Sequence, residues 1–208
     1  MQTYNELAQS VKFKIKGSKI VIADKNPQLD FAGEGRSAFV FKIRSTNKVL
    51  KVFLPPFSHL AQVEAEIYKD LLGNPFYPVL YEYGTNYIVI DYIEGNTLFN
   101  CLLKGILITN DQIKEIDYAL LLTKENGLNP SDIHLRNILI TPRGSIKLID
   151  VARFRQIKPC SQWNDIKTIF EKYYKKQLFP KMIPAFLLNL IAFLYKKNFF
   201  KRFLTNMT

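Results

Sequence analysis

The chain carries three polar residues whose types and spacing suit phosphate chemistry. Asp132 is followed five residues later by Asn137, and Asp150 comes thirteen residues after Asn137. Two carboxylates and an amide oxygen are hard oxygen ligands, which suit Mg²⁺ bound together with substrate phosphates. Because Asp and Asn are also common in turns, this spacing needs support from the rest of the chain.

The segment between Asn137 and Asp150 predicts how these side chains are brought together. Apolar runs at 138–140 and 146–149 flank a turn at 141–144 that contains Pro and Gly. This pattern is typical of a short β-hairpin. One acid precedes the hairpin and one follows it, so we expect the polar side chains to converge at one of its ends.

A glycine-rich turn lies near the start of the chain. Gly33, Gly35, Ala38 and Val40 form the pattern G-x-G-x-x-A-x-V. Glycines let backbone N–H groups approach phosphates with no Cβ in the way. The β-prone residues 39–41 follow the turn, whereas a dinucleotide-binding turn would lead into a helix. We therefore expect a phosphate-binding loop between two strands.

Lys51 lies within the apolar run 49–53, which predicts a central strand. A lysine there either faces solvent or needs a charged partner or a ligand. Helical periodicity over residues 58–72, with Ser58 as the expected cap, offers two glutamates, Glu64 and Glu66. They lie about 200° apart around a helix, so only one of them can face the lysine.

The other elements follow from periodicity and turn residues. Residues 1–30 predict a short helix and then a hairpin with a lysine-covered face, which most simply keeps an edge soluble. We expect two strands within 79–91, helices within 97–126 and 162–176, and a buried helix in the tail 182–203. Asp165 is expected to support the loop around Asp132 or to favour its own helix start.

These parts, in this order, resemble the protein-kinase-like superfamily. The resemblance implies an α+β, bilobal fold with a β-rich N-lobe at 31–94, a reduced, mainly helical C-lobe at 95–208, and 1–30 as an extension. It implies ATP and Mg²⁺ as cofactors. It assigns Asp132 as the catalytic base and Asn137 and Asp150 as the metal ligands. The ATP-binding positions that it implies are Gly33, Gly35, Ala38, Val40, Lys51, Glu64, Asp91 and Ile93.

Two of these assignments rest on position within the family pattern. Glu64, thirteen residues after Lys51, matches the family's helix position better than Glu66 does. The strand 87–95 resembles the family's hinge strand, in which Asp91 and Ile93 would offer backbone groups to adenine and Ile90 would close the back of the pocket.

The residues around the base depart from ordinary kinases. Asp132-Ile133-His134 resembles the D-x-H of small bacterial kinase-like proteins and aminoglycoside phosphotransferases, which implies that His134 lies near the γ-phosphate. Asp150 is followed by Val151-Ala152, and no A-P-E motif follows. About ten residues separate Asp150 from the next predicted helix, so a long activation segment is absent.

Composition limits the partners. Two cysteines and two histidines, all far apart, disfavour a structural zinc site or a disulfide framework, and the N-terminus lacks the apolar core of a signal peptide. We therefore expect a cytoplasmic protein. The net charge of +11 favours anionic partners, but no specific nucleic-acid motif is present.

The tail adds a second expectation. Its apolar run is too short to span a bilayer, and Lys196, Lys197, Lys201 and Arg202 are interleaved with aromatic residues. This basic-aromatic segment predicts peripheral contact with an anionic membrane as an alternative to burial.

The function most strongly indicated is Mg²⁺-dependent phosphoryl transfer from ATP to Ser or Thr of a protein. His134 and the short activation segment leave a small-molecule acceptor as an alternative. A nucleotide-binding pseudokinase scaffold is a further alternative, against which Lys51, Asp132, Asn137 and Asp150 count.

Overall fold

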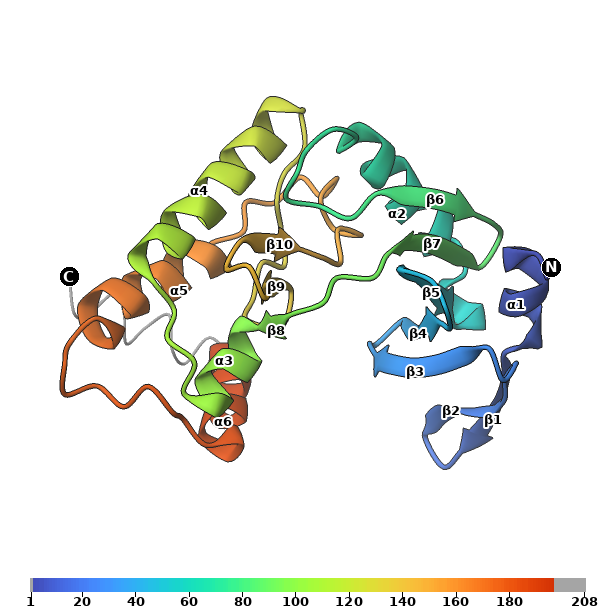
Figure 1. Ribbon diagram of the computed structural model, residues 1–208, viewed down its shortest axis with the longest axis horizontal. Coiled ribbons are helices and arrows are strands. Elements are labelled where there is room, and N and C mark those ends of the chain that lie inside the picture. The colour runs from blue at the N-terminus through green and yellow to red at the C-terminus, as the bar shows by residue number, and fades with distance from the viewer. Residues whose placement is uncertain (1, 197–208) are drawn as a thin grey trace.

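The computed structural model describes residues 2–196, and a β-rich part is followed by a mainly helical part (Figure 1). The strands of the first part end at Asp91, and the second part begins at Asn96. This arrangement confirms the expected α+β fold with a β-rich N-terminal lobe and a helical C-terminal lobe.

The N-terminal extension is a helix and a hairpin, as expected. Helix α1 (Tyr4–Ser10) begins after Thr3, which forms a capping box with Glu6. Strands β1 (Lys12–Lys16) and β2 (Lys19–Asp24) pair antiparallel. Gly17 joins them with a φ of 62°, a left-handed conformation that glycine adopts without strain.

The sheet of the first lobe has five antiparallel strands in the order β3-β4-β5-β7-β6. The strands are β3 (Leu29–Glu34), β4 (Ala38–Ile43), β5 (Lys48–Phe53), β6 (Leu80–Tyr83) and β7 (Tyr87–Asp91). The central strand is β5, and its residues 49–53 are all buried. The expected strands are thus present, with Lys51 in the middle of the sheet.

Helix α2 (Leu60–Asp70) follows a 3₁₀ turn at Pro55–Phe57. The prediction that Ser58 caps this helix is wrong, because the 3₁₀ turn already brings Ser58 into a helical conformation. His59 occupies the N-cap position and makes no side-chain capping hydrogen bond.

Two apolar cores lie on opposite faces of the sheet. One core joins the sheet to α1 through residues such as Leu7, Phe41 and Leu50. The other is continuous from α2 into the C-terminal lobe and includes Ile67 and Ile116. Helix α2 is therefore packed into the core that both lobes share.

The connection between the lobes passes very close to the predicted hairpin. Strands β9 (Ile138–Ile140) and β10 (Ile146–Leu148) form this hairpin, and β8 (Asn96–Thr97) pairs with β9. A Cβ on Gly95 would lie 2.4 Å from the backbone oxygen of Ile140. Glycine at 95 thus allows the connecting chain to approach the site-bearing hairpin.

Helices make up most of the C-terminal lobe. They are α3 (Leu98–Lys104), α4 (Asn110–Glu125), α5 (Gln162–Ile169), the π-helical turn Phe170–Tyr174 and α6 (Ala185–Lys196). Helix α4 ends at Glu125 with Asn126 as its C-cap, and Gly127 follows with a φ of 75°. Among the described helices, none combines the length and the apolar character needed to cross a membrane.

The prediction of a buried tail helix is wrong for its described part. Leu188 is the buried apolar residue of α6, whereas Phe186 and Leu190 are 73% and 48% exposed. The helix contacts the lobe through few residues, so most of its apolar side chains remain at the surface. Residues 197–208, which carry most of the basic-aromatic segment, lie outside the described residues.

Candidate active site

Lys51 and Glu64 form a buried ion pair at the centre of the first lobe. The Lys51 Nζ lies 2.8 Å from Glu64 Oε1 and 2.7 Å from Oε2. Glu64 is completely buried and Lys51 is 9% exposed. Because an unpaired charge would be costly there, each group requires the other or a ligand.

The same lysine also reaches the other lobe. Its Nζ lies 2.9 Å from Asp150 Oδ1, so residues 51, 64 and 150 meet at one point. The side chain of Asp150 remains 48% exposed. The cluster therefore opens toward solvent on the Asp150 side.

The directions of the pKa shifts show how these charges influence one another. Burial alone lowers the pKa of Lys51, but Glu64 and Asp150 more than reverse this, so its pKa lies above its ordinary value. Lys51 holds the pKa of Asp150 below its ordinary value, against partial burial. Burial raises the pKa of Glu64, which Lys51 opposes. Lys51 is thus a permanent cation beside an ionised Asp150.

Glu66, the alternative partner, points elsewhere. Its carboxylate accepts hydrogen bonds from Gln62 and from Arg155 at the surface. Of the two glutamates, Glu64 is the one that contacts Lys51. The helical angle between Glu64 and Glu66 allows only one of them to face the lysine.

Asn137 connects Asp132 to the strand that ends beside Asp150. Its side-chain Nδ2 donates to the Asp132 carbonyl at 3.0 Å, and its backbone carbonyl accepts from Ile149 N at 3.0 Å. Because Nδ2 donates this hydrogen bond, the nitrogen of the Asn137 amide, and not its oxygen, faces the Asp132 carbonyl. The donor set, an amide oxygen on Asn137 and a partly exposed carboxylate on Asp150, fits a hard cation such as Mg²⁺.

Asp132 and Asp150 both have strained backbones. Each has a φ of 63°, and within residues 2–196 Ser45 is the other non-glycine residue with positive φ. Such conformations are uncommon for residues with a Cβ and often occur at functional sites. The strain is therefore located at the two acids that the sequence singled out.

The side chains of Arg153 and His134 lie close to Asp132. Arg153 Nε is 3.5 Å and His134 Nε2 is 3.9 Å from its carboxylate. His134 Nδ1 accepts a hydrogen bond from the Arg136 backbone, which orients the ring. Sequence reasoning missed Arg153; its position three residues after Asp150 was the signal available.

The glycine-rich turn lies beside Lys51. Strand β4 pairs with β5 so that Val40 is opposite Lys51, and Gly35 N donates to Ala38 O at 2.9 Å. A Cβ on Gly33 would meet no atom within 4 Å, so packing within the chain does not require glycine there. Ala38 was expected to be part of the phosphate-binding loop. In the structure its side chain is buried in the core shared by both lobes.

The expected hinge follows β7. The Asp91 amide donates to the Val79 carbonyl at 3.2 Å, and its carboxylate accepts from Val79 N and Tyr81 Oη. Ile90 is buried, and Ile93 lies in the irregular chain after β7. These hydrogen bonds hold Asp91 in place at the start of the connection between the lobes.

The segment after Asp150 is short and anchored. Arg155 bridges Glu66 and Asp70 on α2, at 2.8 Å to each carboxylate. Asn129 N donates to Phe154 O, and Phe154 is completely buried. These contacts tie the segment both to α2 and to the loop that precedes Asp132.

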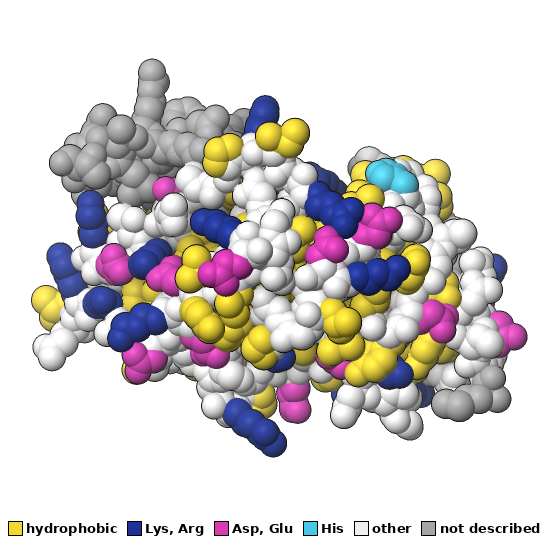
Figure 2. Space-filling view, turned by 90° about the horizontal axis from the view of Figure 1, so that it is seen from above, with side chains coloured by type: hydrophobic (Ala, Val, Ile, Leu, Met, Phe, Trp, Pro, Cys, Tyr) yellow, Lys and Arg dark blue, Asp and Glu magenta, His cyan; other side chains and the backbone are white. Residues whose placement is uncertain are grey.

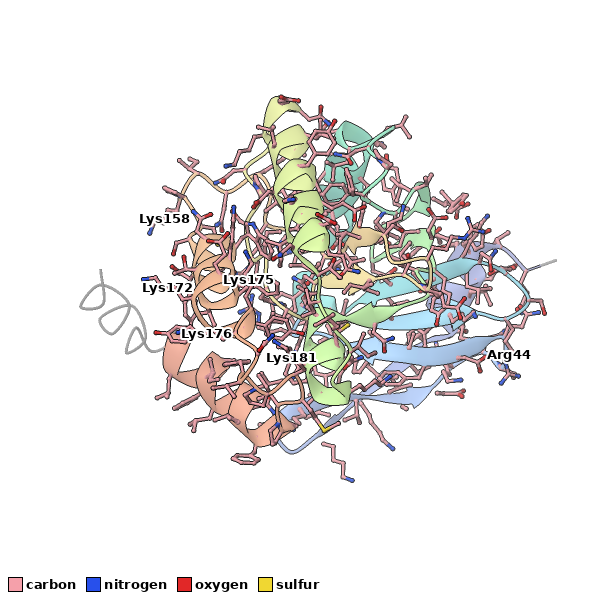
Figure 3. The ribbon with its side chains drawn as sticks, turned by 60° about the vertical axis from the view of Figure 1, so that its left-hand side comes forward. Arg44, Lys158, Lys172, Lys175, Lys176 and Lys181 are labelled. Atoms are coloured by element: carbon pink, nitrogen blue, oxygen red, sulfur yellow. The ribbon has the colours of Figure 1, made fainter. Side chains whose placement is uncertain are left out.

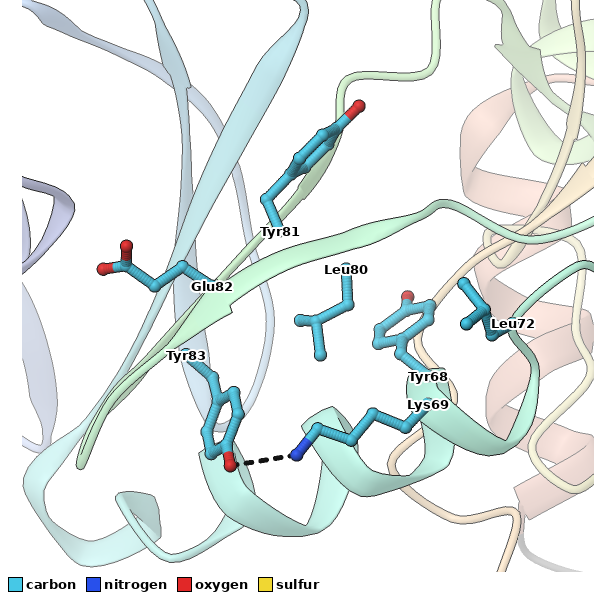
Figure 4. Close-up of a pocket in the computed structure, with 7 residues that line it drawn as sticks. All are labelled: Tyr68, Lys69, Leu72, Leu80, Tyr81, Glu82 and Tyr83. Carbon is cyan, nitrogen blue, oxygen red and sulfur yellow. Dashed lines mark hydrogen bonds between the residues drawn. The ribbon is translucent and has the colours of Figure 1, made fainter.

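Other predicted or possible sites lie apart from this cluster. The Asp165 carboxylate accepts from Ser161 and Tyr195, which places it with its own helix start and α6. A cavity of about 330 Å³ lies between α2 and β6 (Figure 4). Its lining, which includes Tyr68, Leu80 and Tyr83, contains none of the ion-paired residues.

The fold and this arrangement of Lys51, Glu64 and Asp150 define a protein-kinase-like protein. No family model matches the chain. The chain is 46% identical over 198 residues to a Bacillus subtilis protein named "Putative serine/threonine-protein kinase YrzF", covering 94% of this chain and 92% of that one. The chain therefore belongs to the same family of kinase-like proteins.

A more distant relative supports the same class. The chain is 28% identical over 147 residues to a Clostridium perfringens protein named "Probable serine/threonine-protein kinase CPE1738". The match covers 62% of this chain and 22% of that protein. The kinase-like unit is thus shared with a much longer protein.

Proposed function

We propose that this protein transfers the γ-phosphoryl group of ATP to a Ser or Thr hydroxyl of a protein substrate. The observation that carries the proposal is the contact of Lys51 with both Glu64 and Asp150. These residues come from three separate parts of the chain, and their charges are held in one place at the cost of burying two of them. The names of both relatives support the choice of a Ser/Thr acceptor.

In this proposal the cluster binds and orients the triphosphate. Lys51 keeps its charge throughout the physiological range and attracts phosphate oxygens, while Glu64 fixes its position. Gly33 and Gly35 leave room for phosphates to approach the backbone of β3 and the following turn. Asn137 and Asp150 would hold Mg²⁺, which when bound offsets the charge that develops on the phosphates.

Asp132 acts on the acceptor. Its carboxylate orients the hydroxyl and takes its proton as the new oxygen–phosphorus bond forms and the bond to ADP breaks. Arg153 and His134 lie within 4 Å of this carboxylate, where positive charge on Arg153 would favour the transferring phosphoryl group. The neutral form of His134 would supply a hydrogen bond in place of a charge.

Labelled ATP separates this proposal from its alternatives. The full chain with Mg²⁺ is expected to label proteins in a lysate and to lose that labelling when a chelator removes the metal. Labelling of a small hydroxyl compound in place of protein would identify a small-molecule kinase. ATP binding with no transfer to either acceptor class would indicate a nucleotide-binding scaffold and contradict the proposal.

A further inference from the structure

Helix α6 presents apolar side chains to solvent along one stripe. Phe186 and Leu190 are spaced by four residues, which places them on one face, and they are 73% and 48% exposed. Met182, just before the helix, is 62% exposed. A helix of a globular lobe normally turns such a stripe toward the core. Its exposure here therefore needs an explanation.

The opposite side of α6 is the one attached to the lobe. Leu188 and Tyr195 lie on this side, where Leu188 is buried and Tyr195 donates to Asp165, while Asn189 at the edge of the stripe accepts a hydrogen bond from Arg136. These contacts use polar groups as well as apolar ones. The orientation with the apolar stripe outward is thus fixed by hydrogen bonds to two other segments and by the burial of Leu188.

Several exposed lysines lie on the same side of the molecule as α6. Lys172, Lys175 and Lys176 are exposed on and just after the π-helical turn, and Lys158 is exposed on the segment before α5. Figure 3 shows these residues on the same side of the molecule as α6. The face in Figure 2 differs, because acidic and basic side chains are interspersed there. The α6 side therefore combines apolar and cationic groups.

The sequence around α6 is strongly basic, with Asp165 and Glu171 as acids on the adjoining segments. Residues 172–208 contain eight Lys and Arg and no Asp or Glu. A second copy of the chain docking through the same surface would bring cations against cations, which disfavours a symmetric dimer. Nucleic acid would satisfy the lysines but would leave the Phe and Leu stripe in water.

We propose that α6 and the neighbouring lysines form a docking surface for an anionic membrane. A 12-residue helix is about 18 Å long, so it suits a position along the interface and is too short to span the bilayer. Its apolar stripe would enter the acyl boundary while the lysines contact lipid phosphates. The surface lies apart from Lys51 and Asp150, so this proposal is independent of the phosphoryl-transfer chemistry.

Co-sedimentation of the full chain with vesicles tests this surface. We expect binding to vesicles of phosphatidylcholine with phosphatidylglycerol, reduced by added salt, and little binding to phosphatidylcholine alone. Changing Lys172, Lys175 and Lys176 together to Glu should weaken partitioning on the order of a hundred-fold, since each lysine at an anionic surface contributes about five-fold. Phe186→Ser should weaken it by roughly ten-fold.

Matched changes elsewhere provide the controls. Lys12, Lys14 and Lys16 changed together to Glu on the β1–β2 hairpin alter the net charge equally, and Ile15→Ser removes an apolar side chain that is 80% exposed. Neither control should change partitioning by more than about two-fold. Thermal melts show whether each variant is folded.

Three results with vesicles would overturn the proposal. The wild-type chain binds neither vesicle type, or it binds both types equally, or the hairpin variants lose as much binding as the α6-side variants. A dimer in light scattering that dissociates on Phe186→Ser would assign the stripe to a second copy of the chain and would also overturn it.

Discussion

Helix α2 carries acids on two faces, and the two faces have opposite properties. On one face Glu64 is fully buried against Lys51, and on the other Glu66 and Asp70 meet Arg155 at the surface. The buried pair lies in a medium of low polarity, where losing one partner leaves a costly charge. The surface bridge is solvated, so its free energy is small and its main effect is to position α2.

This difference suggests a division of roles within one helix. The buried face holds the lysine that we propose to bind phosphates. The exposed face ties α2 to the segment that follows Asp150. Arg155 thus provides the contact between that segment and α2, and this contact does not depend on a covalently modified residue.

Removal of Lys51 should have the largest effect on stability. Lys51→Met leaves Glu64 buried without its partner, which should lower the free energy of unfolding at neutral pH by about 3–5 kcal/mol. The loss should shrink at acidic pH, because burial raises the pKa of Glu64 and its protonation removes the unpaired charge. Urea unfolding at two pH values measures both effects.

Lys48→Met on the same strand is the matched control. Lys48 is half-buried and bonds the Tyr4 hydroxyl, so its loss should cost about 1 kcal/mol or less. Equal losses for the two variants would mean that the Lys51–Glu64 pair has no special role in stability.

Asp150 should make stability depend on acid pH. Its pKa is lowered in the folded protein, so its stabilising effect is present above its ordinary pKa of 3.8 and is lost as pH falls through the lowered folded value. Wild type and Asp150→Asn should therefore differ in stability at neutral pH and converge in acid. A difference that stays constant from neutral to acidic pH would contradict the Lys51–Asp150 contact.

Removal of Arg155 should have the smallest effect on stability. Arg155→Ala breaks two exposed ion pairs, so the free energy of unfolding should fall far less than for Lys51→Met. If the bridge positions α2, kcat/KM for ATP should nevertheless fall several-fold. Arg44→Ala, which breaks an exposed bridge to Asp30 on β3, is the control and should leave kcat/KM unchanged.

The β-rich lobe and the hairpin could be predicted from sequence because their signals are local. Alternating residues, glycine turns and apolar runs specify β3 to β7 and the β9–β10 hairpin without knowledge of distant contacts. The Glu64 assignment combined such periodicity with a spacing from the kinase family. The geometry agrees with it because a helix presents only one of Glu64 and Glu66 to the sheet.

Features that depend on tertiary context were harder to predict. Arg153 and Arg155 belong to an irregular segment, so no periodicity indicated that they would meet Asp132 and α2. The apolar composition of α6 suggested burial, but its orientation depends on side chains of distant residues such as Arg136 and Asp165. Ser58 failed as a cap because two prolines started a 3₁₀ turn before it.

Transfer of labelled phosphate from ATP tests the central claim most directly, with wild type compared with Asp132→Asn. Asp111→Asn, which changes an acid whose side chain is 91% exposed on α4, is the control. The account predicts that the control keeps its rate and that Asp132→Asn loses roughly 10²–10⁴-fold, the contribution of a general base. An Asp132→Asn protein that is folded and transfers phosphate at the wild-type rate would contradict the account.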